Sequence, residues 1–408
     1  VDDGAAARAL LFGFSAAAVP ALVLVLPALL AGPADRDLLV LEALDRHGPL
    51  TQVEIAAATG LSAASVSNLV RDLVADREVE TSRAVRNGRR AALVAPVGGR
   101  GVVAGVAFGD RDVRLALGTG PRDLRSRVRL PLPPDHVADE GLSRAARLVS
   151  DMLDSTGTAR TDLRAVALGL PAPVDSVSGH VGSEAILPGW RGVAAARELE
   201  TALGVPVVLD NTANLAAQGE LVCGALVGVR HGCHLKTSHG IGAGIVLDGR
   251  VHRGSAGTAG EIGHVTIDEN GPVCRCGNRG CLDTFVGSSA LSSAVAVTHG
   301  HLALRDLVAR ALAGDPGCRR VVTDAGRHIG VAVAGVVNLL NPERVSIGGT
   351  LARTGDLLLD PIREGVERCA IPSAAASVEI VPGSLGEDAD VVGAMAVAAE
   401  RASTTRPA

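Results

Sequence analysis

Residues 260–283 read GEIGHVTIDENGPVCRCGNRGCLD and bring one imidazole and three thiols close together. The donors are His264, Cys274, Cys276 and Cys281. Donors of these types suit a closed tetrahedral Zn²⁺ site, and the glycines at 277 and 280 allow the tight loop that such a site needs. Because protein atoms fill all four positions, the predicted zinc is structural, with no place for an activated water. The alternatives are four unrelated residues or a redox cysteine pair.

The same stretch resembles the signature of the ROK family (repressors, open reading frames and sugar kinases). In that family the histidine and the three cysteines hold zinc, while the glutamate, the histidine and a terminal acid line a sugar pocket. The resemblance therefore implies that Glu261, His264 and Asp283 contact a sugar. The terminal acid is Asp here, where Glu is usual, so its reach is one methylene shorter.

The composition allows two or three packed domains in 408 residues, 47% of them hydrophobic. Aromatic residues make up only 1% of the chain, so the core must consist of Val, Leu, Ile and Ala. A net charge of -5 argues against a globally basic nucleic-acid-binding protein, and any DNA contact must be local. The cysteines outside the metal loop are typical of reduced thiols in a cytoplasmic protein: Cys223, Cys233, Cys318 and Cys369.

The N-terminal segment 1–34 is strongly apolar between Leu10 and Leu30. Hydropathy alone would permit a secretory signal or a membrane span. Pro20 and Pro27 would break a spanning helix, and the flank carries little positive charge. We therefore expect a disordered or mis-assigned leader, with a membrane anchor as the alternative.

Residues 35–97 show a helical pattern that predicts a winged helix-turn-helix. Thr51 is expected to cap a helix at 52–58 that turns Val53, Ile55 and Ala56 towards a core. Ser62 is expected to cap the next helix, with its apolar residues at helical spacing. The outer face of that helix could enter a major groove, and its predicted DNA contacts are Ser62, Ala64, Ser65, Ser67, Asn68 and Arg71.

A predicted hairpin follows, with Asn87-Gly88 at its turn. Its arginines are expected to contact phosphates or the minor groove: Arg83, Arg86, Arg89 and Arg90. The region has slightly more acidic than basic residues, but no acid lies between Thr81 and Val97. The stretch GPLTQVEIAAATGLS also resembles the winged helix-turn-helix of ROK repressors. The alternative is a small helical bundle that binds protein.

From residue 98 onward, paired strands give way to strands that alternate with helices, which predicts an α/β domain. We expect strands at 102–108, 112–117, 125–130, 166–170 and 205–209, with a helix at 138–154. The resemblance implies the actin-like (ribonuclease-H-type) two-lobe sugar-kinase fold. One lobe would comprise residues 98–217 with a C-terminal helix at 388–402, and the other residues 218–387.

A kinase must bind ATP phosphates on glycine-rich backbone and hold a base against the attacking hydroxyl. In the first phosphate loop, Ala107 stands where family kinases have an Asp, and Asp110-Arg111 replaces a small polar pair. The second loop keeps its glycines, but His239 replaces the usual Thr. In the segment that corresponds to Asn-Asp-Ala-Asn, Thr212 occupies the base position; Asp210 would be displaced by several ångströms. Losing a positioned base typically costs about 10²–10⁴-fold in rate, so the sequence predicts no kinase chemistry.

Although the catalytic positions differ from those of the family's kinases, the residues expected to line a sugar pocket are present. Matching the family's pocket, the expected ligand contacts are Gly169, Trp190, Asn211, Glu261, His264 and Asp283. Trp190 could instead pack at the hinge between the lobes. The segment Val345–Gly349 resembles the adenine-side strand and turn of the kinases and is interpreted as structural inheritance.

These features predict a sugar-responsive DNA-binding regulator of carbohydrate-use genes, with repression as the expected response. Its expected partners are operator DNA, a sugar or sugar phosphate, and a second copy in a homodimer or homotetramer. The main alternative is an ATP-dependent sugar kinase that carries a DNA-binding segment. A membrane-tethered sugar sensor is the second alternative.

Overall fold

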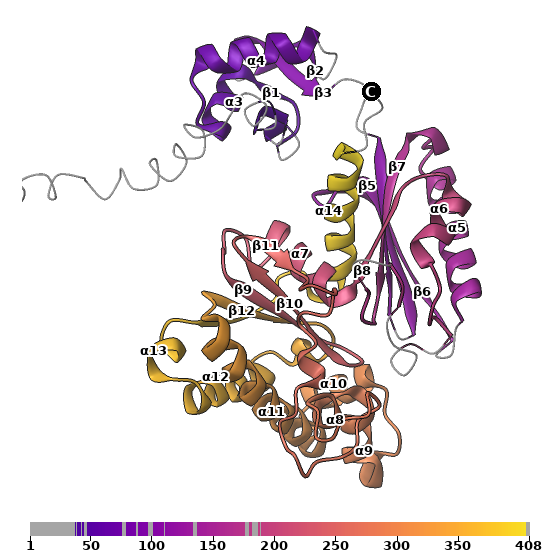
Figure 1. Cartoon of the computed structure of the whole chain (residues 1–408), viewed down its shortest axis with the longest axis vertical. Helices are drawn as coiled ribbons and strands as arrows, with labels where there is room; N and C mark the ends of the chain where they lie inside the picture. Colours follow the sequence, from indigo (N-terminus) through magenta and orange to yellow (C-terminus); the bar gives the residue numbers. More distant parts are fainter. Residues whose placement is uncertain are drawn as a thin grey trace, which may run out of the picture. The chain divides into compact units, whose positions relative to one another are not determined.

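The computed structural model describes residues 37, 39–41, 43–44, 47–75, 79–86, 89–96, 101–109, 111–133, 137–175, 179–181, 187 and 189–404. The apolar segment expected to be a leader lies outside these residues. The chain divides into two compact units, residues 1–100 and 101–408 (Figure 1). In the described part, no single helix is long and apolar enough to cross a membrane. One bent helix pair, 52–59 with 63–75, passes that test jointly, at an angle of 114°.

The first unit has the predicted helix-turn-helix and wing. Its elements are β1 (Leu50–Thr51), α3 (Gln52–Thr59), α4 (Ala63–Ala75), β2 (Val79–Arg86) and β3 (Arg89–Pro96). The strands form an antiparallel sheet in the order β1-β3-β2, and Arg86 pairs with Arg89 across the hairpin.

Local side-chain bonds explain where the helices of this unit begin. Thr51 and Glu54 form a reciprocal capping box at α3, which confirms the predicted cap. The Ser65 amide donates to Ser62 Oγ at 3.1 Å, so Ser62 caps α4 as predicted. The prediction that Val53 faces the core is wrong: its side chain is 76% exposed, while Ile55 is fully buried.

The first lobe of the second unit is a five-stranded sheet in the order β6-β5-β4-β7-β8. Its strands are β4 (Val102–Phe108), β5 (Asp112–Gly120), β6 (Asp123–Pro131), β7 (Leu163–Leu170) and β8 (Val207–Asn211). Helices α5 (Ala138–Ser155) and α6 (Ala195–Leu203) cover one face of this sheet in Figure 1, and α14 (Ala389–Thr404) covers the other. The structure confirms the five strands predicted for this lobe and the helix predicted at 138–154, which is α5.

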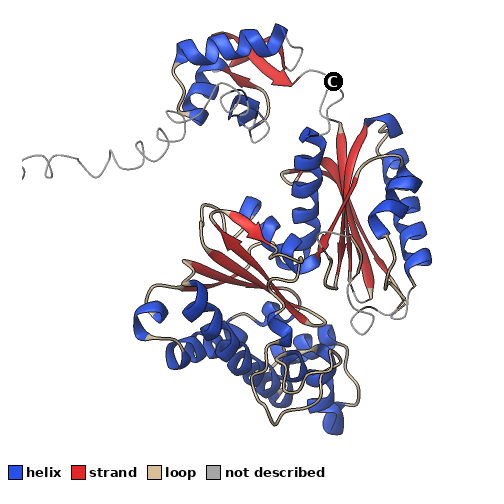
Figure 2. Cartoon of the chain, viewed as in Figure 1, coloured by secondary structure: helices blue, strands red, loops and turns tan. Residues whose placement is uncertain are grey.

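The second lobe is another five-stranded sheet, in the order β11-β10-β9-β12-β13, with helices packed beside it (Figure 2). Its strands are β9 (Gly232–Thr237), β10 (Ile241–Leu247), β11 (Arg250–His252), β12 (Arg344–Gly348) and β13 (Glu379–Pro382). Its helices are α8 (Asp283–Val286), α9 (Ser288–His299), α10 (Leu304–Leu312), α11 (Pro316–Leu340), α12 (Asp356–Cys369) and α13 (Pro372–Ala375).

Helix α7 (Thr212–Cys223) joins the two lobes, because it contacts α14 on one side and β9 and β10 on the other. A Cβ on Gly219 would lie 2.2 Å from the Ala389 carbonyl oxygen, so only a glycine permits this approach to α14. The buried cores consist mainly of Val, Leu, Ile and Ala, as the composition predicts. Two sheets are thus held together by one central helix, whose first turn carries the predicted base position.

Candidate functional site

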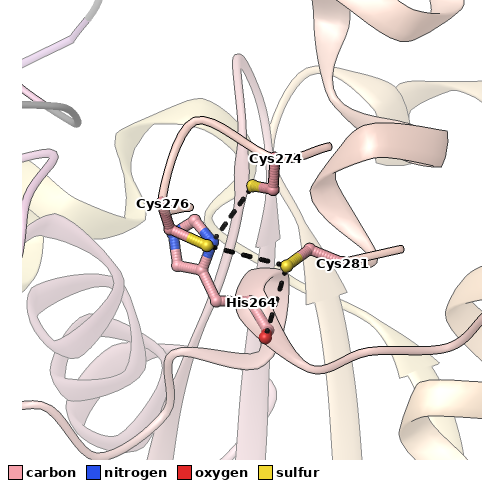
Figure 3. Close-up of side chains that lie close together, drawn as sticks. All are labelled: His264, Cys274, Cys276 and Cys281. Atoms are coloured by element: carbon pink, nitrogen blue, oxygen red, sulfur yellow. Dashed lines mark hydrogen bonds between the residues drawn. The ribbon is translucent and has the colours of Figure 1, made fainter. Parts of the chain in front are cut away.

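The four predicted metal ligands lie together in the second lobe (Figure 3). His264 Nδ1 lies 3.6 Å from Cys274 Sγ, and Cys276 Sγ lies 3.7 Å from Cys281 Sγ. All four ligand atoms fall within 4.8 Å of one another. Tetrahedral zinc with bonds of about 2.0–2.3 Å places neighbouring ligand atoms about 3.5–3.8 Å apart. This cluster could therefore bind a metal ion, and its donor set fits zinc.

The metal loop is shaped by hydrogen bonds between its ends and by two glycines. The Cys274 amide donates to the Asn278 carbonyl at 2.7 Å, and the Gly277 amide donates back to Cys274 at 2.9 Å. Gly277 and Gly280 have φ of 94° and 65°, which other residues rarely adopt. A Cβ on Gly280 would also lie 1.5 Å from the carbonyl oxygen of Asp268. These hydrogen bonds and glycines bring the three cysteines of the loop towards His264.

The predicted sugar contacts of the second lobe lie beside this loop. Glu261 immediately precedes the short helix η2 (Ile262–His264), and burial raises the pKa of its carboxyl group. Asp283 begins α8, and its Oδ1 accepts from the Ile241 amide at 3.3 Å. Its Oδ2 lies 3.4 Å from Arg275 Nη2, in the metal loop. Asp283 therefore ties the second glycine loop to the metal loop, a role that its position in the sequence did not reveal.

The first lobe contributes the ends of two neighbouring parallel strands. Gly169 lies near the end of β7, where a Cβ would be 2.7 Å from Leu215 Cδ1. Asn211 ends β8 and caps α7: its Oδ1 accepts from the Ala213 amide at 2.7 Å, and its Nδ2 donates to the Ala172 carbonyl at 3.0 Å. A Cβ on Gly242 of β10 would lie 3.1 Å from Ala213 Cβ, so these two strand ends and β10 meet at the start of α7.

Trp190 lies inside the first lobe. Its side chain is fully buried, and its ring packs edge-on against Phe108 at a centroid distance of 5.1 Å. A Cβ on Gly141 would lie 2.9 Å from the indole ring, so a glycine makes room for it. These contacts favour the packing alternative over a direct ligand contact, although they place it in the lobe core, not at a hinge.

The predicted base position holds no proton acceptor of useful basicity. Thr212 is the first residue of α7 and is buried. Asp210 is also buried, and both of its oxygens are engaged. Its Oδ1 accepts from the Asn211 amide and from Asn214 Nδ2, at 2.7 and 2.9 Å. Its Oδ2 accepts from Arg253 Nε at 2.9 Å and lies 2.8 Å from Nη2 of the same ion-paired guanidinium. A carboxylate with three hydrogen bonds and an ion pair to Arg253 is a structural anchor, and no local sequence pattern predicted its arginine partner.

The predicted DNA contacts lie in the first unit. Ser62, which caps α4, is exposed, and so are Ala64, Ser67, Asn68 and Arg71 on the helix itself. Ser65 is half-buried and hydrogen-bonded to Ser62. On the wing, Arg83 is exposed. The side chains of Arg86, Arg89 and Arg90 lie outside the described part, and so does Asp110 of the first phosphate loop.

Comparison with known proteins identifies relatives along most of the chain. The profile described as "ROK family" matches residues 103–401, and the profile described as "MarR family" matches residues 32–90. A glucokinase of Halalkalibacterium halodurans is 32% identical over 71% of this chain and 92% of its own length. A putative xylose repressor of Caldicellulosiruptor sp. is 28% identical over 88% of this chain and 94% of its own.

A solved structure supports the same relationship. A ROK family transcriptional regulator, described as a homologue of the E. coli MLC protein, has a TM-score of 0.74 and 26% identity to this chain. The match covers 90% of this chain and 96% of that one. The chain belongs to the ROK family: it has that family's two-lobe sugar-kinase fold, preceded by a MarR-type winged helix-turn-helix.

Proposed function

We propose that this protein is a transcriptional regulator, in the first place a repressor, which binds operator DNA and responds to a sugar or sugar phosphate. The observation that carries the proposal is the pairing of a winged helix-turn-helix with a ROK domain whose base position holds Thr212. Without a positioned base, phosphorylation of a bound sugar would be slower by about 10²–10⁴-fold. Occupancy is then useful only as a signal to the DNA-binding unit.

The DNA-binding surface in this proposal is the exposed face of α4 together with the wing. Asn68 has an amide that suits the edge of an adenine, and Arg71 is exposed and long enough to reach a phosphate. The regulator would act as a homodimer or homotetramer, so that two recognition helices bind two half-sites of a palindrome.

The effector pocket would be formed by Gly169, Asn211, Glu261, His264 and Asp283. With Nδ1 of His264 on a structural zinc ion, Nε2 is left to contact a sugar hydroxyl. The metal loop and Asp283 would hold these contacts at the lobe boundary, where α7 joins both sheets. A ligand that bridges the lobes would then bias their relative angle, and through it the affinity for DNA.

An ATP-dependent sugar kinase is the second candidate, favoured by the likeness to a glucokinase and by the glycines kept in the second phosphate loop. Against it, Asp210, two residues before the base position, already accepts three hydrogen bonds and forms an ion pair with Arg253. Proton transfer to Asp210 would require breaking its bonds to Arg253.

The test is a DNA-binding titration with duplexes taken from upstream of carbohydrate-use genes, repeated with a panel of sugars and sugar phosphates. We expect one duplex to bind, and one ligand to change its affinity without ATP. Arg71→Ala should weaken binding on all duplexes and reduce the slope of log affinity against log salt by about 1. Arg319→Ala, an exposed arginine of the second unit, is the matched control. Rapid sugar phosphorylation with no DNA binding would support the kinase instead.

A further inference from the structure

Two acidic residues at the start of α14 lie where the lobes meet. Glu387 belongs to η4 (Gly386–Asp388), which follows the last strand of the second lobe. Asp390 belongs to the first turn of α14, which packs on the sheet of the first lobe. The chain therefore passes from the second lobe to the first at these two residues.

Asp390 is paired with one cation from each lobe. Its Oδ2 lies 2.8 Å from Nη2 of Arg114, on β5 of the first lobe, and 2.6 Å from Nζ of Lys236, on β9 of the second. The carboxylate is completely buried. Burial by itself would raise the pKa of Asp390, but the two cations hold it below its ordinary value, so the carboxylate stays charged.

Glu387 repeats this arrangement closer to the surface. Its Oε2 lies 2.6 Å from Arg129 Nη1, on β6 of the first lobe, and 2.5 Å from Arg305 Nη2, on α10 of the second. Its Oε1 accepts from Thr350 Oγ1 at 2.7 Å. Arg114 also donates to the Glu387 carbonyl oxygen. Each acid thus bonds both lobes, and we call Glu387 and Asp390 with their four cations the interlobe clamp.

Little space remains beside the clamp. The cavity there measures about 10 Å³ and is lined by Lys236, Ser238, Gly349, Glu387 and Asp390, among others. That volume holds about one water molecule, whereas sites for drug-sized ligands measure roughly 300–1,000 Å³. In the part of the chain that the structure describes, three buried polar atoms lack a hydrogen-bond partner: Arg114 Nε, His234 Nε2 and Asp390 Oδ1. A single water could satisfy atoms of this kind.

The cavity beside the clamp is lined by residues from two segments that resemble nucleotide-binding parts of sugar kinases. Ser238 directly precedes the second glycine loop, and Gly349 ends the segment that resembles the adenine-side turn of sugar kinases. A nucleotide that used both segments would have to occupy the place of the clamp. Binding the nucleotide would therefore require breaking the ion pairs that join the two lobes.

We propose that Glu387 and Asp390 determine which ligands the interlobe cleft accepts: their ion pairs to both lobes close the cleft and exclude a nucleoside triphosphate. The proposal rests on the proposed function, since a regulator that senses sugar alone has no use for a bound nucleotide. Because the inner ion pair is buried, it is only weakly screened by salt.

The test is calorimetric titration of the full-length protein with the magnesium complex of the non-hydrolysable nucleotide AMP-PNP. For the wild type we expect no saturable binding up to about 1 mM. Glu387→Gln keeps the shape of the side chain and removes its charge, and it should bind the nucleotide at least about tenfold more tightly than that limit. Glu379→Gln is the matched control, because the partner of Glu379 is Arg344 in the same lobe, and it should behave as the wild type.

A second variant breaks the same ion pair, so the test remains valid if Glu387→Gln does not fold. Arg129→Gln removes the partner of Glu387 in the first lobe at a half-exposed site, and it should give the same gain. Binding of AMP-PNP by the wild type in the micromolar range would overturn the proposal. So would a lack of AMP-PNP binding by both variants, provided that they are folded and retain their DNA affinity. If the wild type does not bind DNA, the proposed function is contradicted instead. Failure of the proposed function and failure of the clamp proposal are therefore distinguishable.

Discussion

The two sides of the predicted sugar pocket differ in the kind of chemistry that their residues can support. On the side of the second lobe, four metal-ligand atoms lie within 4.8 Å, and two acids stand beside them. On the side of the first lobe, Thr212 occupies the base position. The carboxylate oxygens of Asp210 accept hydrogen bonds from Asn211 and Asn214 near the start of α7 and from Arg253. The second lobe carries a candidate metal site, whereas the described residues at the predicted base position of the first lobe are a threonine and a carboxylate paired with Arg253.

The largest effect should come from the metal loop. Cys281→Ser removes a buried thiolate, so zinc content measured by mass spectrometry should fall from about one per chain to near zero, because three remaining ligands bind far more weakly. The effector response should disappear with it, while DNA binding by the first unit persists. Cys369→Ser, at an exposed thiol remote in sequence from the loop, is the control. An unchanged response in metal-free protein would show that the loop does not position the pocket.

A smaller effect is expected at Asp210, the buried carboxylate on the first-lobe side of the predicted pocket. Arg253→Met leaves Oδ2 of Asp210 without its donor inside the protein, and an unsatisfied buried acceptor costs about 1–3 kcal/mol. Urea unfolding of the second unit should show a free energy of unfolding lower by about that amount. Arg250→Met, at the exposed start of β11, should change it by under about 0.5 kcal/mol. Equal stability of the two variants would mean that Asp210 is not a structural anchor.

The pH dependence of effector binding sharpens the role of Glu261. Burial raises the pKa of this carboxyl group, so it takes up a proton at a higher pH than an ordinary glutamate. If the ionised form accepts from sugar hydroxyls, effector affinity is full above the raised pKa and is lost as the pH falls through it. Glu261→Gln should bind less tightly near neutral pH and lose this dependence. A wild-type affinity that is flat with pH, measured by calorimetry, would remove Glu261 from the contact set.

The smallest change is expected from restoring a carboxylate. Thr212→Asp places an acid at the base position, but the interlobe clamp would still exclude the nucleotide, so release of ADP should stay at the background rate. The same assay on Thr212→Asp combined with Glu387→Gln separates the two barriers. Turnover in the single variant would show that the cleft already admits ATP.

The sequence predicted those parts of the site whose residues lie close together along the chain. The metal loop was predicted correctly as a cluster, because its ligands and glycines fall within one short segment. The cap at Thr51 and the hairpin wing follow from local rules in the same way. Val53 failed because helical spacing alone does not say which of two half-apolar faces meets the core.

Long-range pairs were not predictable. The cations of the interlobe clamp come from four separate elements, β5, β6, β9 and α10, and look like ordinary surface charges in the sequence. The resemblance left Trp190 open between a ligand contact and packing, and its packing partner Phe108 lies far from it in the sequence. Burial and pairing of such residues depend on the folded arrangement of both sheets, which no local pattern specifies.

The central claim is that an occupied pocket signals to DNA without phosphoryl transfer. The most direct measurement is a fluorescence-anisotropy titration of one operator duplex with the protein, with and without its effector sugar, in the absence of any nucleotide. The account predicts that the sugar shifts the affinity by roughly 5–150-fold, the range of ordinary allosteric coupling. An affinity that the sugar leaves unchanged until ATP is added would contradict it.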